Sequence, residues 1–288
     1  MGSEGSRPQI TSTRNPLVTR FRALADRKGR EASGRFVVEG TRLLEQALAD
    51  GIALDAVVYD PRAPADPRLE SVLRRAAAAG ARLHTASAHV VAACSQVETP
   101  QGIVAIARRP AASLEGLTRS PAALLVVADR IQDPGNLGTI IRIADAAGAS
   151  GLIAVAGTVD PFNPKAVRAT MGSVFHLPVV DAAAEDVIEA LRTHDIRILV
   201  ADQHGAVDFL DAEYRRPCAI VLGNEGQGVD QRWIDHAAAT VRIPMYGRAE
   251  SLNVAVAAAL LLYEARRQAN RHDRHNLHDL HNSPTRGF

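Results

Sequence analysis

Six short apolar runs between residues 124 and 244 constrain the fold of this 288-residue chain more than any other feature. Most of them are separated by segments with the composition of helices. Strands that are apolar throughout and alternate with helices are typical of a parallel sheet that helices cover on both faces. We therefore predict an α/β fold for this half of the chain, with strands in the runs LLVVA, GLIAVAG, VFHLPVV, IRILVA, AIVLG and TVRIP.

Most of the glycines and functional polar residues of this half fall in the loops that would follow these strands. On a parallel sheet, ligands bind beyond the carboxyl ends of the strands, so a binding site is expected in these loops. Their sequences are DRIQDPGNLG, ADQHGA, GNEGQGVD and PMYGRAESLN.

The N-terminal half has a smaller α/β pattern. Its apolar runs RFVVEG, LDAVVYD, ARLHTA and GIVAIA predict strands, and TRLLEQALAD and RLESVLRRAAAAG predict helices. A stretch with Pro, Ser and Gly but no periodicity follows, which indicates a linker. The predicted organisation is a basic N-terminal helix and extension (1–30), a small domain (31–108), a linker (109–122), the parallel-sheet domain (123–270) and a polar, basic tail (271–288).

The net charge is only +1, but positive charge is concentrated near the N-terminus, where residues 1–42 hold nine Arg or Lys against four Asp or Glu. Such clustering is typical of a surface that binds a polyanion, although a solvated terminus would look the same. Leu17, Val18, Phe21 and Leu24 interleave with the basic residues at helical spacing. We therefore predict an amphipathic helix that holds a basic face in place.

Cysteine usage and hydropathy disfavour several classes of protein. Cys94 and Cys218 are far apart and outside any CxxC spacing, which argues against a disulfide framework or a zinc site and fits a reducing cytoplasm. No apolar run reaches the length of about 18 residues that a membrane span needs. The polar start lacks the apolar core of a secretory signal. Metal binding is not expected either, because a helix would rotate the four regularly spaced histidines of the tail off one face: His272, His275, His278 and His281.

Two of the loops resemble phosphate-binding turns only superficially. DPGNLGTIIRIADAAG (133–148) lacks both the GxGxxG spacing of a dinucleotide fold and the GK[ST] ending of a P-loop. In GNEGQG (223–228), glycines surround the carboxylate of Glu225 and allow a close approach of the backbone to a ligand. Taken singly, each loop fits a tight strand-to-helix connection equally well.

The run SLNVAVAAALLLYEARRQ (251–268) raises a different question, because two polar residues stand before a strongly helix-forming stretch. Ser251 is a reasonable N-cap for this helix. Capping by Ser251 leaves Asn253 unexplained, since Asn inside a first helical turn contributes little as a helix former. We therefore expect that something polar is held at this point.

Three segments together resemble, in order and spacing, the motifs of the SpoU (TrmH) family of RNA 2′-O-ribose methyltransferases: NLGTIIR, LGNEGQGV and IPMYGRAESLNVAVAAALLLYEA. In addition, FVVEGTRLLEQAL is similar to the N-terminal substrate-binding domain of many members, a small α/β fold akin to ribosomal proteins that binds RNA. The resemblance implies a deep trefoil knot at the C-terminal end of the sheet, one of the rare exceptions to unknotted topology. It also implies S-adenosylmethionine bound in a bent form among the knot loops, and a homodimer formed through the C-terminal domain.

By motif position, the resemblance implies which residues form the site. The active-site set is Asn136, Arg142, Glu225, Ser251 and Asn253. The cofactor is expected against Gly223, Ile243 and Leu252, with Met245, Ala201, Asp202 and Gln203 as further candidates. Apolar side chains beside backbone amides suit an adenine ring. Because a guanidinium stays protonated in proteins, we expect Arg142 to orient and stabilise the attacking ribose hydroxyl rather than to remove its proton.

The predicted function is 2′-O-methylation of a ribose in structured RNA, with 23S rRNA as the favoured substrate. Transfer RNA is an alternative, although family members that act on it often lack the N-terminal domain. A non-catalytic RNA-binding or ribosome-assembly module is another, which the intact active-site set disfavours. The Arg-rich composition suggests a high-GC genome. Some such organisms use rRNA methylases of this family for self-resistance, so resistance to a ribosome-targeting antibiotic is a further hypothesis.

We also predict the locations of three side chains outside the motifs. Trp233 is expected in the core or in a dimer interface, whereas Lys165 and Arg168 lie either against RNA or on a solvated face.

Overall fold

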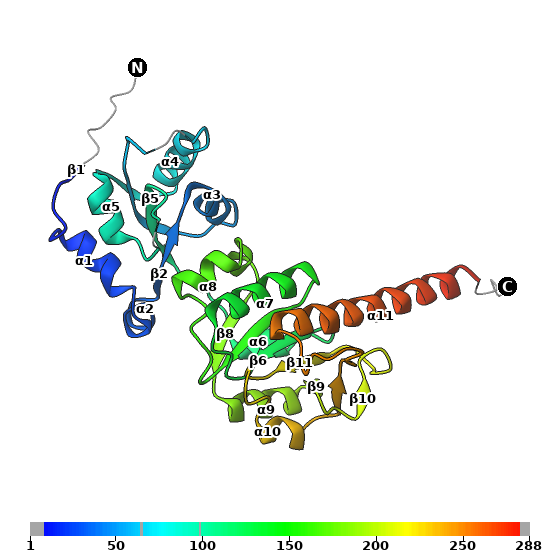
Figure 1. Ribbon diagram of the computed structural model, residues 1–288. Coiled ribbons are helices and arrows are strands. Elements are labelled where there is room, and N and C mark those ends of the chain that lie inside the picture. Colours follow the sequence, from blue (N-terminus) through cyan, green and yellow to red (C-terminus); the bar gives the residue numbers. More distant parts are fainter. Residues whose placement is uncertain (1–8, 64–65, 98, 283–288) are drawn as a thin grey trace. The chain divides into compact units, whose positions relative to one another are not determined.

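The structure is a computed structural model that describes residues 9–63, 66–97 and 99–282, with side chains up to residue 271. By contacts, the chain divides into two compact units (Figure 1). Unit 1 comprises residues 1–111 and 160–176, and unit 2 comprises residues 112–159 and 177–288. The segment 160–176 therefore packs with the N-terminal unit, although along the sequence it lies between two strands of unit 2.

Unit 2 is built on a seven-stranded sheet in which every strand pair is parallel, with the order β10-β12-β9-β11-β6-β7-β8. This confirms the predicted parallel-sheet domain. The central strands are buried on both faces, as their near-continuous apolar sequences require. The strands are β6 (Leu124–Ala128), β7 (Gly151–Val155), β8 (Val179–Ala182), β9 (Arg197–Ala201), β10 (Val207–Asp208), β11 (Cys218–Leu222) and β12 (Ala239–Arg242).

Helices cover both faces of this sheet. Figure 1 shows α7 (Pro134–Ala146) and α11 (Val254–Asn282) on one side and α9 (Ala184–Thr193) and α10 (Gln231–Asp235) on the other. Trp233 of α10 is fully buried in the core on the second side, which confirms the prediction of a core position. The predicted linker contains a short helix, α6 (Leu114–Thr118), whose Leu117 belongs to the same core.

One predicted strand is wrong over its first half. In VFHLPVV, the strand begins only at Val179, and Ser173–Phe175 form a 3-10 turn that belongs to unit 1. The ring centroid of Phe175 lies 6.3 Å from that of Phe36. The first half of the run is therefore apolar because it packs in the core of unit 1, not because it lies in the sheet.

Unit 1 has a five-stranded mixed sheet with the order β1-β4-β3-β5-β2, in which β5 pairs antiparallel with both neighbours. Val18 and Phe21 of α1 are buried, which confirms the predicted amphipathic helix, although it ends at Ala23 and a second helix follows. The elements are β1 (Gln9–Ile10), α1 (Pro16–Ala23), α2 (Arg27–Ser33), β2 (Arg35–Glu39), α3 (Thr41–Ala49), β3 (Leu54–Tyr59), α4 (Leu69–Ala78), β4 (Arg82–Ala86), α5 (Ala88–Cys94), β5 (Ile103–Arg108) and α8 (Pro164–Ala169).

A buried ion pair ties the segment 160–176 into unit 1. Arg30 Nε lies 2.5 Å from Asp160 Oδ2, and both side chains are almost inaccessible to solvent. Arg30 also donates to the carbonyls of Leu24 and Ala25, at 2.8 and 2.7 Å. A buried charge is tolerated only when it is paired and hydrogen-bonded, so this network fixes the start of the segment within unit 1.

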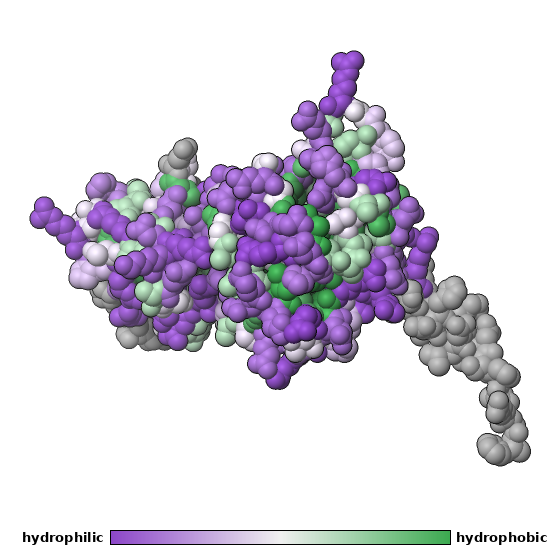
Figure 2. Space-filling view, turned by 90° about the horizontal axis from the view of Figure 1, so that it is seen from below, coloured by the Kyte–Doolittle hydropathy of each residue, from purple (hydrophilic) through white to green (hydrophobic). Residues whose placement is uncertain are grey.

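Hydrophilic side chains cover most of the face shown in Figure 2, and apolar ones reach the surface in places. The largest apolar side chains exposed among the described residues are Met171, Leu210, Tyr246, Leu252, Val256, Leu260 and Tyr263. No helix in the part of the chain that the structure describes is long and apolar enough to cross a membrane.

Candidate active site

A cavity of about 860 Å³ lies in unit 2, at the carboxyl ends of its parallel strands. Its walls are the loops after β9, β11 and β12 together with the segment that leads into α11: residues 201–204, 223–229, 243–245 and 250–254. Asn136, near the start of α7, also lines the cavity, as do Leu222, Val241, Arg242 and Ala257. Three of the four loops expected to carry a ligand thus form one wall each, and the fourth contributes Asn136.

A chain of hydrogen bonds connects the three sequence motifs across this cavity. The amide nitrogen of Asn253 donates to Asn136 Oδ1 at 2.9 Å. The amide nitrogen of Asn136 in turn donates to Glu225 Oε1 at 3.0 Å. A carboxylate can only accept, so Glu225 fixes which way the Asn136 amide points, and Asn136 does the same for Asn253.

Asn253, not Ser251, is the N-cap of α11, so the sequence-based assignment of the cap was wrong. The helix begins at Val254, and Asn253 Oδ1 accepts from the backbone N–H of Ala255 at 2.9 Å and of Val256 at 3.4 Å. One amide therefore does two things: its oxygen caps the helix and its nitrogen reaches Asn136. Ser251 lies exposed in the cavity wall and makes no hydrogen bond with any described residue.

Glu225 is held as an anion at the N-terminus of α7. Burial pushes the pKa of Glu225 up, but the hydrogen bond from Asn136 and those from backbone N–H groups, including Gln132 and Asp133, outweigh it, so the pKa lies below its ordinary value. The positive end of the helix dipole at this place favours the same charge state. Glu225 is therefore a weak proton acceptor near neutral pH, and its geometry suits an orienting role.

The loop that carries Glu225 is closed tightly by its own backbone. Asn224 and Gly228 exchange two backbone hydrogen bonds of 3.0 Å, and Asn224 Oδ1 accepts from the N–H groups of Gly226 and Gln227 at 2.9 Å. A Cβ at Gly223 would lie 2.5 Å from Gly228 C and Val229 N. Only glycine fits at position 223, so the loop presents backbone rather than a side chain to the cavity there.

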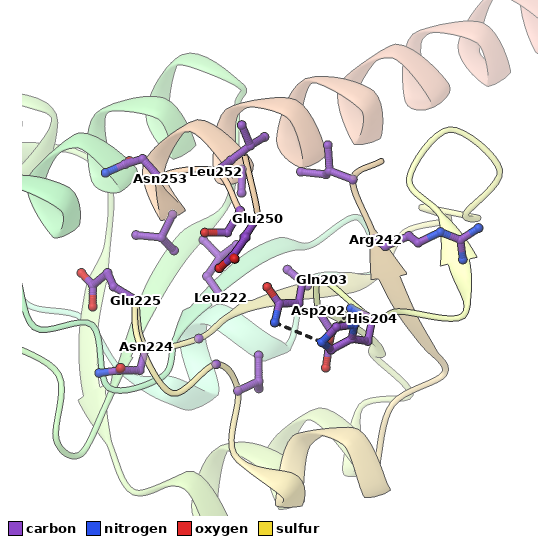
Figure 3. A pocket seen from close by; sticks show the side chains of 18 of the residues that line it. Asp202, Gln203, His204, Leu222, Asn224, Glu225, Arg242, Glu250, Leu252 and Asn253 are labelled. Carbon is purple, nitrogen blue, oxygen red and sulfur yellow. Dashed lines mark hydrogen bonds between the residues drawn. The ribbon is translucent and has the colours of Figure 1, made fainter. Parts of the chain in front are cut away.

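The cavity is acidic. Figure 3 shows the Glu225 side chain on one side, those of Asp202, Gln203 and His204 on the opposite side, and Glu250 between them. The guanidinium of Arg242 turns away and donates to the carbonyls of Gly205 and Ala206 at 2.8 and 2.9 Å. Three carboxylates thus line the space without a cation directed into it from the lining residues.

All seven residues expected at the cofactor line this cavity: Gly223, Ile243, Leu252, Met245, Ala201, Asp202 and Gln203. Four of the five expected active-site residues also line it, namely Asn136, Glu225, Ser251 and Asn253. The structure does not bring Arg142 into the cavity. Its side chain is on the exposed side of α7 and forms no hydrogen bond or ion pair with a described residue.

Sequence reasoning missed Asn224 and Glu250, which the cavity includes. An Asn two residues before a glycine is a recognisable signal for a side chain that caps its own loop, so Asn224 could have been found. Glu250 has no such signal, because only the fold turns residue 250 towards the other loops.

In the described part of the chain, the cysteines and the possible metal ligands show no sign of a role in the chemistry of the site. Cys94 and Cys218 are both buried, and burial raises the pKa of the Cys94 thiol to about 12 and of the Cys218 thiol to about 11. Neither thiol is a nucleophile at neutral pH. The described side chains contain no cluster that could hold a metal ion, and the four histidines of the tail lie outside them.

The two roles of Asn253 can be separated by substitution. Asn253→Ser keeps a capping oxygen but loses the donor to Asn136, whereas Asn253→Ala loses both. We expect Asn253→Ala to lower the stability of the fold by about 1 kcal/mol and Asn253→Ser to lower it by less. Both variants should reduce the rate of the predicted methyl transfer equally. Thermal unfolding and single-turnover rates measure the two effects, and a normal rate in Asn253→Ser would contradict a role for the Asn253–Asn136 bond.

Known proteins match this chain over most of its length. The model of the SpoU rRNA Methylase family matches residues 123–263, and that of the MRM3-like substrate binding domain matches residues 15–105. The chain is 36% identical over 260 residues to the 23S rRNA (guanosine(2553)-2′-O)-methyltransferase RlmP of Bacillus subtilis, covering 90% of this chain and 99% of that protein. It is 35% identical to the 23S rRNA (uridine(2479)-2′-O)-methyltransferase of Streptomyces viridochromogenes, covering 90% and 92%.

Solved structures are similar over nearly the same length. The AdoMet-bound rRNA methyltransferase of Sinorhizobium meliloti is 38% identical and superposes with a TM-score of 0.82, covering 92% of this chain and 99% of that one. The SpoU methyltransferase AviRb of Streptomyces viridochromogenes, in complex with AdoMet, has a TM-score of 0.79 at 34% identity, covering 89% and 99%. With residues 123–263 matched by the family model and a relative 36% identical over 90% of the chain, the chain belongs to the SpoU rRNA methylase family.

Proposed function

We propose that this protein transfers a methyl group from S-adenosylmethionine to a ribose 2′-hydroxyl of 23S rRNA. The observation that carries the proposal is the single cavity in which all three motifs meet through the Asn253–Asn136–Glu225 chain of hydrogen bonds. The names of the relatives in Bacillus subtilis and Streptomyces viridochromogenes support both the reaction and the class of RNA.

The residues of the cavity fit S-adenosylmethionine. Its volume of about 860 Å³ is within the usual range for pockets that hold such ligands. Leu222, Ile243 and Leu252 offer apolar surface to an adenine ring, and the three carboxylates complement a positively charged sulfonium. When bound, S-adenosylmethionine supplies an electrophilic methyl group.

The chain's own residues hold and orient the reactants. The closed loop around Asn224 provides a rigid wall, and Glu225 keeps the amides of Asn136 and Asn253 in one orientation. Arg142, outside the cavity, serves the RNA: as a cation with a planar fork of donors, it orients the ribose or its phosphate. Positioning of two reactants can by itself supply much of a rate enhancement.

We also propose that unit 2 carries the trefoil knot implied by the family motifs. Support comes from the path of the chain after β12. Residues 243–253 line the same cavity as the loop 223–229, and Asn253 reaches Asn136, 117 positions earlier in the sequence. A chain end that passes between earlier loops brings together residues this far apart at one edge of a sheet.

Unit 1 supplies the affinity for RNA. Counted over the sequence, unit 1 has eighteen Lys or Arg against twelve Asp or Glu, whereas unit 2 has fifteen against twenty. Three arginines of unit 1 surround one carboxylate: Arg20, Arg35 and Arg108 lie 3.3, 2.8 and 3.0 Å from Asp55. One arginine would neutralise Asp55, so this group keeps two positive charges on fixed guanidinium planes that suit phosphates.

The match of unit 1 also supports 23S rRNA as the substrate. The family model for residues 15–105 describes a substrate binding domain, and the curated relatives named above that share this length act on 23S rRNA by name. A cytoplasmic site of action follows from an rRNA substrate. Resistance to a ribosome-targeting antibiotic stays a hypothesis, which drug susceptibility with and without the gene would test.

The direct test of the function maps ribose methylation on 23S rRNA. We expect incubation of unmodified rRNA with the protein and S-adenosylmethionine to add one 2′-O-methyl group, detected as a block to alkaline cleavage at a single nucleotide. Transfer RNA is the control substrate. Methylation of tRNA alone would mean that tRNA, and not 23S rRNA, is the substrate. Tight RNA binding without affinity for S-adenosylmethionine would favour the non-catalytic RNA-binding module.

The arginine group around Asp55 should set the salt dependence of RNA binding. Deleting residues 1–30 would remove buried side chains of α1 and the Arg30–Asp160 pair, so substitutions are the cleaner test. Arg20→Gln with Arg108→Gln should flatten the slope of log affinity against log salt by about 0.7 to 0.9 for each phosphate that the variant no longer neutralises.

A matched control removes the same charge from the same unit. Arg62 and Arg68 are exposed and pair with Asp60 and Asp66, so Arg62→Gln with Arg68→Gln should leave the salt slope unchanged. Equal slopes for the two double variants would mean that RNA responds to the net charge of unit 1 and not to this group.

We propose that the protein is a homodimer formed through unit 2. Val256, Leu260 and Tyr263 lie at helical spacing on α11, and their exposed fractions are 48, 37 and 56%. An apolar stripe of this kind on a helix marks an interaction surface, and a second copy is its simplest partner.

Sedimentation at micromolar concentration should therefore show a dimer, and Leu260→Arg should convert it to a monomer. The control is Leu210→Arg, because Leu210 is also exposed but belongs to the segment after β10 and not to α11. A wild-type monomer would contradict the proposed dimer, and a dimeric Leu260→Arg would exclude this stripe as its interface.

A further inference from the structure

Asp129 and Arg130, which directly follow β6, are not among the residues that line the cavity. Asp129 is fully buried, yet its carboxylate has few partners: Oδ2 accepts from the backbone N–H of Asp230 at 3.0 Å and from the guanidinium of Arg130 at 3.2 Å. Oδ1 is buried without a hydrogen-bond partner among the described residues. Burying a charge with so few partners costs free energy. The stability of the fold therefore does not explain why an Asp stands at position 129.

Arg130 has an unusual backbone that serves the same loop. Its φ of 57° places it in the left-handed region, which is uncommon for a residue other than glycine. In this conformation its carbonyl accepts from the side-chain amides of Asn224 at 2.8 Å and Gln132 at 2.9 Å. Its guanidinium reaches the carbonyl of Gly228 at 3.3 Å.

These contacts hold the loop 223–230 at both ends. Asn224 is tied to the carbonyl of Arg130 at the beginning of the loop, and Gly228 and Asp230 are tied to the side chains of Arg130 and Asp129 at its end. Glu225 stands between these anchors. Because Gln132 N–H also donates to Glu225 Oε2, at 3.2 Å, the same turn sets the position of the carboxylate that orients Asn136.

We propose that Asp129 and Arg130 form a latch that positions the cofactor loop, and that they act on the reaction through this loop without touching either reactant. This inference rests on the proposed methyltransferase function. The free-energy cost of burying the Asp129 carboxylate and the left-handed backbone of Arg130 are then local destabilising features that organise the site before the reactants bind. Release of the latch moves Glu225 and the backbone wall of the cavity together.

Two variants release the latch without an obvious penalty to the fold. Asp129→Asn keeps the size and one acceptor for Asp230 N–H but loses the charge that holds Arg130. Arg130→Gly removes the guanidinium while glycine adopts the left-handed backbone freely. Each should weaken S-adenosylmethionine binding about tenfold and lower kcat about 10- to 100-fold, with KM for RNA unchanged.

Two further variants distinguish a positioning role from a merely structural one. The double variant Asp129→Asn, Arg130→Gly should be no worse than the more severe single variant, because residues that act as one unit are not additive. Arg130→Lys keeps a cation beside Asp129 and should restore most of the cofactor affinity.

The matched control is the buried Arg30–Asp160 ion pair of unit 1. Asp160→Asn breaks the pair with Arg30 in unit 1 and should lower the melting temperature while leaving the dissociation constant for S-adenosylmethionine unchanged. Calorimetric titration, steady-state kinetics and thermal unfolding give the three readouts for every variant.

The outcomes separate the latch from the proposed function. If the wild-type chain binds no S-adenosylmethionine, the proposed function fails. If the wild type binds it and both latch variants bind it within twofold, the latch is overturned. It is also overturned if the effects of the two substitutions add fully, or if affinity falls only in step with melting temperature, as a structural defect would require.

Discussion

The hydrogen bonds from Asn253 to Asn136 and from Asn136 to Glu225 are the interaction on which the rest of the site depends. They join a helix cap, a helix start and a glycine-rich loop that are far apart in the sequence. Glu225 sets the direction of the chain because a carboxylate only accepts. Without that anion, both amides could turn over, and the cavity would present donors and acceptors in more than one arrangement.

Each participant is held in place by a feature with a local physical cause. Asn253 is fixed because its oxygen caps α11. Asn136 lies in the first turn of α7, where its N–H donates to the N-cap Asp133 at 2.8 Å. Glu225 sits in a loop that permits only glycine at position 223. The parallel sheet below is buried on both faces and brings the ends of these elements to one edge.

Much of this arrangement could be predicted from the sequence because it rests on local patterns. The apolar runs at β6, β7, β9 and β11 had the length and the near-continuous apolar composition of buried strands, and the motif loops followed them. The prediction of a strand over all of VFHLPVV was wrong, because the sequence does not indicate in which of the two cores an apolar side chain such as Phe175 is buried. The N-cap was assigned to Ser251 because propensity cannot locate the first helical residue to within two positions.

The latch and the exposed position of Arg142 were not predictable in the same way. Asp129 and Arg130 act through their hydrogen bonds with Asp230 and Asn224, which lie about a hundred positions later. No local spacing in the sequence predicts these contacts. Arg142 belongs to a recognisable motif, but only the direction of its side chain on α7 places it outside the cavity. Side-chain direction across a fold depends on packing, which a one-dimensional pattern does not contain.

The central claim is a division of labour, in which the cavity holds S-adenosylmethionine and Arg142 acts on the RNA from outside it. The most direct measurement combines calorimetric titration of S-adenosylmethionine with single-turnover methylation of 23S rRNA for Arg142→Ala and Arg142→Lys. We predict wild-type cofactor affinity in both variants, a methylation rate lowered by about 10²- to 10³-fold in Arg142→Ala, and only slight recovery in Arg142→Lys because the planar fork is lost. Near-normal turnover in Arg142→Ala, or loss of cofactor binding with an intact fold, would contradict this division.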